Sequence, residues 1–221
     1  MNGDHLHSPN SVRPAIAIDG PAASGKSSAG KMFASQLGYR FLDTGLMYRA
    51  ATWDVMNNGI DINESEAVSR VVGKMEFSVI DGESGENLIL VNGQDVTRFL
   101  HSTAVDVSVS PVSAITAVRK IMVAEQRRIA TTGSIVMVGR DIGTVVIPDA
   151  PLKIFLTASS ETRANRRYSE FIADGTEVDF TDILSSIESR DRIDSSREDS
   201  PCLLYTSPSP RDQRGSGLGG W

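Results

Sequence analysis

Residues 20–27 read Gly20-Pro21-Ala22-Ala23-Ser24-Gly25-Lys26-Ser27 and match the phosphate-loop pattern G-x-x-x-x-G-K-[ST] without a gap. The apolar run Ala15–Ile18 precedes this loop, and Ser27–Leu37 follows it with apolar residues at helical spacing. A chance match in a glycine-containing turn is the alternative, but it would lack the flanking strand and helix. The stretch therefore predicts a nucleoside-triphosphate site at the end of a buried strand.

The chemistry of this loop follows from its residue types. Glycines permit positive φ, so that successive main-chain N–H groups point inward, and the following helix presents its positive end to the phosphates. We expect Lys26 to reach the β- and γ-phosphates and the Ser27 hydroxyl to ligate Mg²⁺. The residues expected to bind ATP through the loop are Gly20, Pro21, Ala22, Ala23, Ser24, Gly25, Lys26, Ser27 and Ser28.

Composition narrows the class of protein. The 221 residues include 22 Lys and Arg against 28 Asp and Glu, a net charge of −6, which argues against nucleic acid or an anionic membrane as the main partner. The single cysteine, Cys202, excludes an internal disulfide and a cysteine-based metal site. The polar start lacks a signal-peptide core and no apolar run approaches ~20 residues, so a cytoplasmic location is expected.

Strands and helices alternate along most of the chain. The pattern predicts further buried strands at Arg40–Leu42, Ile135–Val138 and Lys153–Leu156, and helices at Met47–Met56, Ser113–Thr131, Glu161–Phe171 and Phe180–Arg192. The alternation is interrupted by β-rich segments at Glu76–Ile80 and Leu88–Val91, and Asn92-Gly93 is a strong hairpin signal. We therefore expect an α/β fold with a parallel sheet and a small antiparallel insert.

Other motifs distinguish between the classes of phosphate-loop protein, such as switch GTPases and small-molecule kinases. A switch GTPase needs Asp-x-x-Gly after a buried strand and an Asn-Lys-x-Asp base reader. The only Asp-x-x-Gly is Asp212–Gly215, near the end of the chain, and Asn-Lys-x-Asp is absent. A small-molecule kinase is the better interpretation.

Four blocks of sequence resemble the bacterial cytidylate kinases. They are GPAASGKSS (20–28), FLDTGLMYR (41–49), GRDIGTVVIPDAPLKIFLTAS (139–159) and SRDRIDSSREDSP (189–201), in family order and spacing. The resemblance covers residues 14–201. It implies a P-loop kinase core, a monophosphate-binding insert near residues 70–105 and a short Arg-rich lid near 160–180. It further implies transfer of the γ-phosphoryl group of ATP to CMP or dCMP with Mg²⁺, by a monomer.

The resemblance also implies roles for individual residues. Lys26, Arg140 and Arg190 would be catalytic. The lid residues Arg163 and Arg167 would bind ATP. No general base is needed, because the acceptor's own phosphate oxygen is already anionic. The residues implied to bind CMP are Thr44, Tyr48, Arg49, Ser110, Arg119, Arg140, Asp141, Arg190, Asp194 and Arg197.

Plainer explanations stay open for several of these residues. Arg190, Asp194 and Arg197 have the spacing of an intrahelical salt-bridge ladder, and Ser110 before Pro111 is typical of a turn or helix cap. The lid arginines are equally typical of a solvated basic face. Alternative functions are a UMP or dTMP kinase, which a carboxylate at position 141 disfavours, and a nucleotide-binding regulator without transfer activity.

Both ends depart from the pattern. Residues 1–13 form a polar leader, and residues 202–221 contain Ser-Pro-Ser-Pro and four glycines without periodicity, which suggests a non-native or disordered tail. The family pattern continues after residue 201 with a last strand and helix. We therefore expect an exposed sheet edge and a chain of reduced stability and activity.

Overall fold

The computed structural model describes residues 13–81, 87–173, 175–197, 199 and 201–202, so the predicted leader and tail lie outside it except for Arg13 and Cys202. In chain order its elements are β1 (Ile16–Asp19), α1 (Lys26–Leu37), β2 (Arg40–Asp43), α2 (Thr44–Asn57), α3 (Ser65–Val72), β3 (Phe77–Asp81), β4 (Asn87–Val91), β5 (Gln94–Asp95), η1 (Thr97–Phe99), α4 (Thr103–Ala114), α5 (Thr116–Ala130), β6 (Ile135–Gly139), η2 (Ile142–Val146), β7 (Leu152–Phe155), α6 (Ser160–Ala173) and α7 (Phe180–Ser196).

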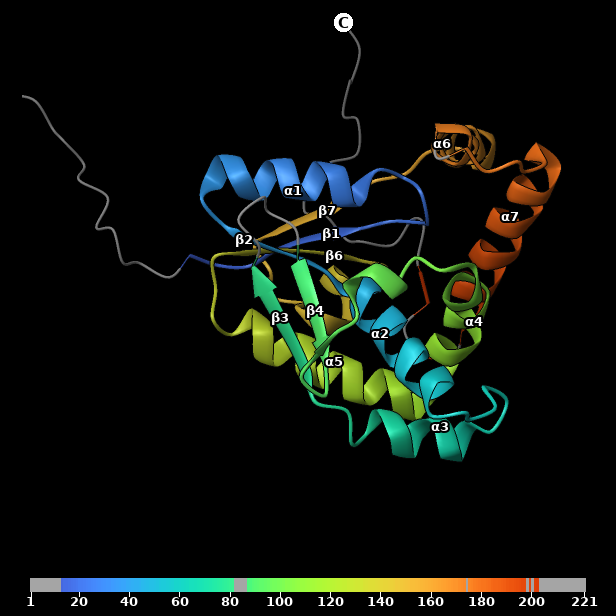
Figure 1. Ribbon diagram of the computed structural model, residues 1–221. Coiled ribbons are helices and arrows are strands. Elements are labelled where there is room, and N and C mark those ends of the chain that lie inside the picture. The colour runs from blue at the N-terminus through green and yellow to red at the C-terminus, as the bar shows by residue number, and fades with distance from the viewer. Residues whose placement is uncertain (1–12, 82–86, 174, 198, 200, 203–221) are drawn as a thin grey trace, which may run out of the picture.

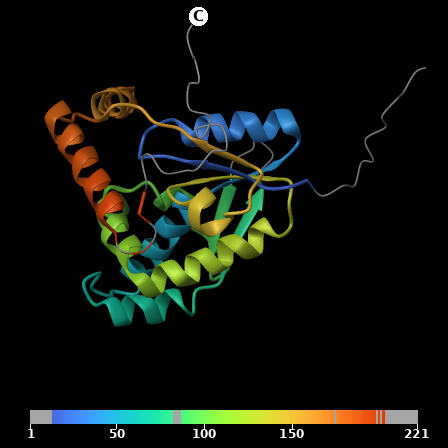
Figure 2. The same ribbon diagram turned by 180° about the vertical axis from the view of Figure 1, so that it is seen from behind.

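Four parallel strands form the central sheet in the order β2-β6-β1-β7, which confirms the predicted α/β class. Helix α1 covers one face, and α2 and α5 lie on the other (Figures 1 and 2). Within β1, Ile16 and Ile18 pack on the α1 side, whereas Ala17 joins the core under α2 and α5. This period of two follows from the alternation of side chains along a strand. Because the strands are parallel, their carboxyl ends meet at one edge of the sheet.

The predicted antiparallel insert is a second sheet in the order β3-β4-β5. Asn92 and Gly93 join β4 to β5 with φ values of 51° and 78°, the left-handed pair that the hairpin signal predicted. The sheet packs on α2, where Ile89 and Val91 bury their side chains against Ala50. Helix α2 is thereby held between the two sheets.

Two helices were not expected from the sequence. Helix α3 was not predicted, and α4 occupies Thr103–Ala114 although the helix was expected only from Ser113. Valines and serines dominate α4, and their intrinsic preference disfavours a helix, so that tertiary packing of its buried face decides the conformation. The expected single helix is divided at Ile115, whose φ of −69° and ψ of 116° are extended.

Helices α6 and α7 pack against each other at one side of the molecule (Figure 1). Ala164 from α6 and Ile183 and Ile187 from α7 form their buried contact. Among the described residues no single helix has the length and apolar character to cross a bilayer. Helices α4 and α5 reach that length together, but they are bent by 95°.

Gly30 sets how closely α1 approaches the sheet. A β-carbon at this position would lie 2.6 Å from Val138 Cγ1 and 2.8 Å from Phe41 Cε2, both in buried side chains. We expect Gly30→Ala to lower the free energy of unfolding by about 1–3 kcal/mol, because the gain in helix propensity is smaller than the overpacking. Urea denaturation measures the change. Ser35→Ala, on the exposed face of the same helix, is the matched control and should be neutral or stabilising; equal behaviour of the two variants would contradict the packing argument.

Candidate active site

The phosphate loop connects β1 to α1 through three residues with positive φ. These are Gly20 at 149°, Ala23 at 55° and Gly25 at 95°. At Gly20 a β-carbon would lie 2.0 Å from the Leu156 carbonyl oxygen, so that only glycine fits there. Ala23 adopts a conformation that costs an alanine about 1 kcal/mol. The loop therefore has the tight, inward-turned backbone that the motif predicts.

Lys26 begins α1 and is only 6% exposed. Its Nζ donates hydrogen bonds to the Pro21 carbonyl oxygen at 2.5 Å and to Ser24 Oγ at 3.3 Å. Burial, and then the nearby Arg140 cation, lower the pKa of Lys26 to about 7. Asp43 and Asp19 only partly offset these effects, so an anion entering the loop would add favourable negative charge beside this ammonium.

Ser27 and Asp43 bring two oxygen atoms together beside Lys26. Ser27 Oγ donates to Asp43 Oδ2 at 2.5 Å, while Asp43 Oδ1 accepts from Gly45 N–H at 2.9 Å and caps α2. Hydroxyl and carboxylate oxygens are ligands that Mg²⁺ accepts when substrate phosphates and water complete its shell. The described residues contain no group of three acidic, histidine or cysteine side chains for a self-contained metal site.

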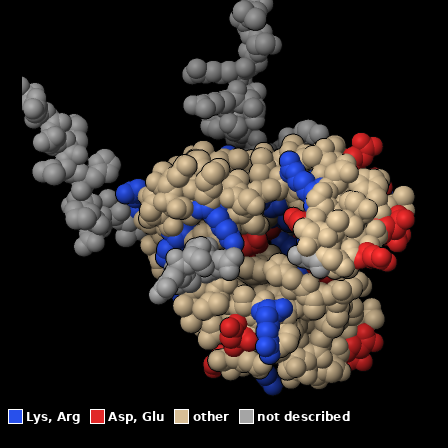
Figure 3. Space-filling view, turned by 45° about the horizontal axis from the view of Figure 1, so that its top comes forward, with Lys and Arg blue, Asp and Glu red and all other residues tan. Residues whose placement is uncertain are grey.

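A cavity of about 240 Å³ brings most of the predicted residues together. It lies where β1, β2 and β6 end, and α4, α6 and α7 complete its wall. The lining includes Lys26, Ser27, Thr44, Tyr48, Arg49, Arg119, Arg140, Asp141, Arg167, Arg190, Asp194 and Arg197. Seven Lys and Arg side chains line it against three Asp, so the cavity favours an anionic ligand. The surface is hollowed on the face shown in Figure 3, and basic and acidic side chains meet there.

Arg119 and Arg140 are among the lining arginines that carboxylates hold. Arg119 Nη2 lies 2.5 Å from Asp141 Oδ2 with both side chains buried, and Arg140 Nε donates to Asp194 Oδ2 at 2.8 Å. Burial opposes the charge of Asp194, but Arg140 and Arg197 outweigh it and hold the pKa of this carboxyl below its ordinary value. The pairing expected from the helical spacing is present, because Asp194 Oδ1 lies 3.6 Å from Arg197 Nη2. Asp194 also pairs with Arg140, which belongs to the loop after β6.

Arg190 differs from its neighbours. Among the described residues no carboxylate lies within ion-pair distance of it, and its buried Nε has no hydrogen-bond partner. Burial, and then Arg140, lower the pKa of Arg190 to about 10. A largely buried guanidinium without a counter-ion is costly, so the position of Arg190 at the cavity is the best evidence in the site for an anionic ligand.

Outside the phosphate-loop stretch 20–28, two predicted residues do not line the cavity. Arg163 is 4% exposed and forms two hydrogen bonds to Asp191, at 3.1 and 2.5 Å, and a third to the Ala22 carbonyl oxygen at 3.2 Å. The alternative of a solvated face is therefore wrong for Arg163, because these partners hold it against the loop, while its expected role toward ATP stays a prediction. Ser110 is buried inside α4 rather than in a turn, and Ser113 from the next turn lines the cavity instead.

Sequence reasoning missed Asp19, Asp43 and the loop contact of Arg166. Asp19 ends β1, and its two carboxylate oxygens accept from Ile142 and Gly143 N–H groups, both at 2.7 Å. Burial raises the pKa of Asp19 to about 6. Arg166 Nη1 donates to the Ser24 carbonyl oxygen at 3.1 Å. The carboxylates could have been found by the rule that polar residues directly after buried strands meet at one sheet edge.

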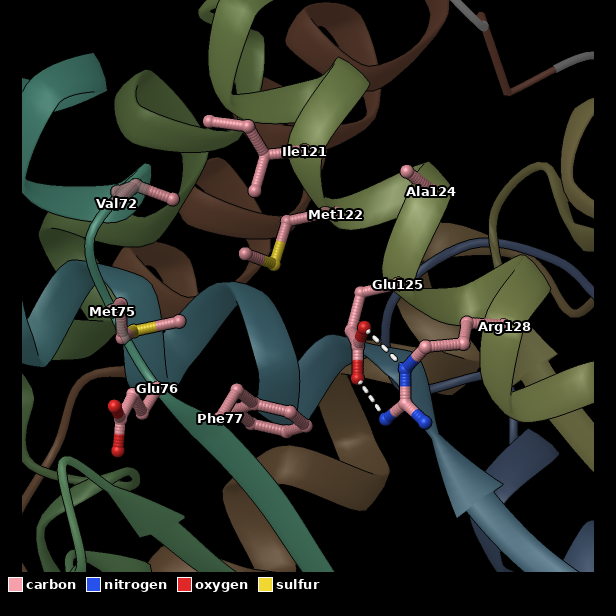
Figure 4. Close-up of a pocket in the computed structure, with 9 residues that line it drawn as sticks. All are labelled: Val72, Met75, Glu76, Phe77, Ile121, Met122, Ala124, Glu125 and Arg128. Carbon is pink, nitrogen blue, oxygen red and sulfur yellow. Dashed lines mark hydrogen bonds and ion pairs between the residues drawn. The ribbon is translucent and has the colours of Figure 1, made fainter.

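A separate groove of about 650 Å³ lies between α5 and the segment that joins α3 to β3 (Figure 4). Its walls are mostly apolar, with Met75, Phe77 and Met122 facing the space. Arg128 pairs with Glu125 at its edge at 2.5 Å. None of the predicted site residues lines this groove, so the chemistry belongs to the basic cavity.

The lowered pKa of Lys26 predicts a dependence of stability on pH. In the unfolded chain Lys26 keeps its proton up to its ordinary value of 10.5, whereas the folded protein releases it near 7. Between these values the unfolded state binds more protons, so stability rises with pH. From pH 7 to 9 wild type should gain roughly 2 kcal/mol in free energy of unfolding over Lys26→Met, as measured by urea denaturation. Parallel pH curves for the two proteins would refute the assignment.

The chain is similar to known proteins along most of its length. The family model described as cytidylate kinase matches residues 16–207. The curated cytidylate kinase of Rhodococcus opacus is 46% identical over 187 residues, which cover 84% of this chain and 81% of that protein. Those of Streptococcus equi subsp. equi and Carboxydothermus hydrogenoformans are 48% and 43% identical over 186 residues, 84% of this chain and 82% and 83% of theirs. The chain belongs to the cytidylate kinase family.

Proposed function

We propose that the protein transfers the γ-phosphoryl group of ATP to CMP or dCMP, giving ADP and CDP or dCDP. One observation carries the proposal. A second cavity lies over the phosphate loop, and its lining includes Ser24, Gly25 and Ser28. This cavity and the arginine-lined cavity share three lining residues, which are Ala23, Lys26 and Ser27. Donor and acceptor phosphates in these adjoining spaces would meet at Lys26. The monomeric state and the cytoplasmic location stay predictions.

For this transfer the protein has to position the two substrates and place positive charge around the transferring phosphoryl group. An oxygen of the acceptor phosphate bonds to the γ-phosphorus, the bond from that phosphorus to the β,γ-bridging oxygen breaks, and ADP leaves. Lys26, Arg140 and Arg190 would face the charge that spreads over the transferring group. Ser27 and Asp43 would hold Mg²⁺, which would supply further neutralisation of phosphate charge. No proton has to be removed from the nucleophile.

Recognition of the acceptor would use the other wall of the cavity. Arg49, Thr44 and Tyr48 from α2 would hold the monophosphate with Arg140, and Arg197 and Asp194 would lie toward the ribose. Asp141 suits cytosine because its carboxylate accepts from the exocyclic amino group, and Arg119 donates to the base O2 and N3 acceptors. Arg119 is well placed to be rigid, because Asp141 holds it and its Cζ lies 5.6 Å from the centre of the Tyr48 ring.

A panel of acceptors tests the proposed function. ADP release from ATP is measured with CMP, dCMP, UMP, AMP and dTMP, and with no acceptor. We expect CMP or dCMP to give a kcat/KM at least about 100-fold above AMP and dTMP, because a site built to pair with a polar edge rejects the analogue that leaves it unpaired. ATP binding without acceptor-dependent turnover would favour the regulator instead.

Changing Asp141 should move the preference between the two pyrimidines. In Asp141→Asn the amide presents a donor to the 4-carbonyl of uracil, while the favourable acceptor for cytosine is reduced. We expect kcat/KM for CMP to fall about 10–100-fold and the ratio of UMP to CMP turnover to rise, by about 1–3 kcal/mol of discrimination. Asp182→Asn, an exposed change on α7, is the charge control. An unaltered UMP to CMP ratio would remove Asp141 from base selection.

A further inference from the structure

Asp106 on α4 contacts arginines from two other helices. Its Oδ1 lies 2.5 Å from Arg49 Nη2 on α2, and its Oδ2 lies 3.1 Å from Arg167 Nη2 on α6. Both arginines line the basic cavity. One carboxylate thus joins an arginine of the acceptor wall to an arginine of the predicted lid, although Asp106 belongs to none of the sequence motifs.

Asp106 is the main counter-ion of Arg49, because the other titratable groups nearby are uncharged or screened by water. His101 lines the same cavity, but burial and then Arg49 lower its pKa, so it is uncharged near neutral pH. Glu170 also pairs with Arg167, at 3.2 Å, but its side chain is 62% exposed and screened by water. Within the described part of the chain, Arg49 has no other ion-pair partner. The charge of Arg49 is therefore balanced by Asp106 alone.

A phosphate in the cavity would compete with this carboxylate. A phosphate monoester near neutral pH carries about −1.5 to −2 charge and three acceptor oxygens, against one charge and two oxygens on Asp106. Arg49 also donates from Nη1 to the Leu100 carbonyl oxygen at 2.7 Å, a contact that holds its guanidinium in place while the ion pair is exchanged. An acceptor phosphate on Arg49 would therefore weaken the hold of Asp106 on Arg167.

We infer that Asp106 is a positioning residue that keeps Arg167 on the acceptor side until the acceptor phosphate replaces it on Arg49. The inference rests on the proposed function. With the acceptor site empty, Arg167 is withheld from the γ-phosphate of bound ATP, and transfer to water is suppressed. In that side reaction a water oxygen bonds to the γ-phosphorus, the bond to the β,γ-bridging oxygen breaks, and ADP, inorganic phosphate and a proton are released.

Two substitutions at position 106 test this role. Asp106→Asn removes the charge, and Asp106→Glu keeps it. We expect the Asn variant to raise ADP release without acceptor about threefold to tenfold and to lower KM for CMP by a similar factor, with kcat at saturating CMP changed less than about twofold. The Glu variant should stay within about twofold of wild type, as should the charge control Asp182→Asn. An unchanged acceptor-free rate, or a higher KM for CMP, would overturn the inference.

A measurement on the wild-type chain makes the test independent of how the variants fold. The side-chain Nε–H resonances of Arg49 and Arg167 are followed by NMR as CMP or cytidine is added without ATP. We expect CMP to shift both resonances and cytidine to shift neither, because only the phosphate competes with Asp106. A CMP shift confined to Arg49 refutes the coupling. Failure of the proposed function is seen separately, as wild type that releases no ADP in response to CMP.

Discussion

The structure depends on neutralising buried positive charge around one cavity. Burying several guanidinium groups is costly unless carboxylates accompany them. Asp141 and Asp194 meet this need for Arg119 and Arg140, and Asp106 meets it for Arg49. The lining carboxylates are Asp43, Asp141 and Asp194, and even together with Asp106 they do not balance the seven lining cations, so that an anionic substrate would supply the remaining charge. The same pairs therefore leave an excess of positive charge that a phosphate could balance.

The fold supplies this arrangement because parallel strands end at one edge. The phosphate loop follows β1, Asp43 ends β2, and Arg140 and Asp141 follow β6, so that three chain segments far apart in sequence open onto a common space. Asp19 fastens two of them, since its carboxylate accepts N–H groups from Ile142 and Gly143. Helices α4, α6 and α7 then close the open side and bring their own acidic and basic groups.

Protein oxygens already pair with several of the cationic groups at the cavity. Lys26 folds back onto its own loop, and Asp106 occupies two arginines that face the cavity. In each place a protein oxygen stands where a phosphate oxygen would give a stronger partner. In the proposed function, substrate phosphates would exchange these polar contacts for charge-assisted ones, and the energy available is only the difference between the two sets.

Much of this could be predicted from residues that act locally. The phosphate loop, the alternation of apolar runs and the Asn92-Gly93 turn all depend on neighbours in the chain, and the sheets that they indicated are present. The helical conformation of α4 was not predictable in this way, because its valines and serines favour other structure and packing overrides them. The burial of Ser110 within α4 was missed for the same reason.

The sequence by itself determined the kind of site: a loop for phosphates, a hydroxyl for a cation, and arginines for an anionic acceptor. Only the tertiary structure decided which arginines reach the cavity. Arg163 and Arg167 lie one turn apart on α6, yet Asp191 and the Ala22 carbonyl hold the first beneath the loop while the second faces Asp106. The direction of a long charged side chain is set by its partners from other elements, and these are distant in the sequence.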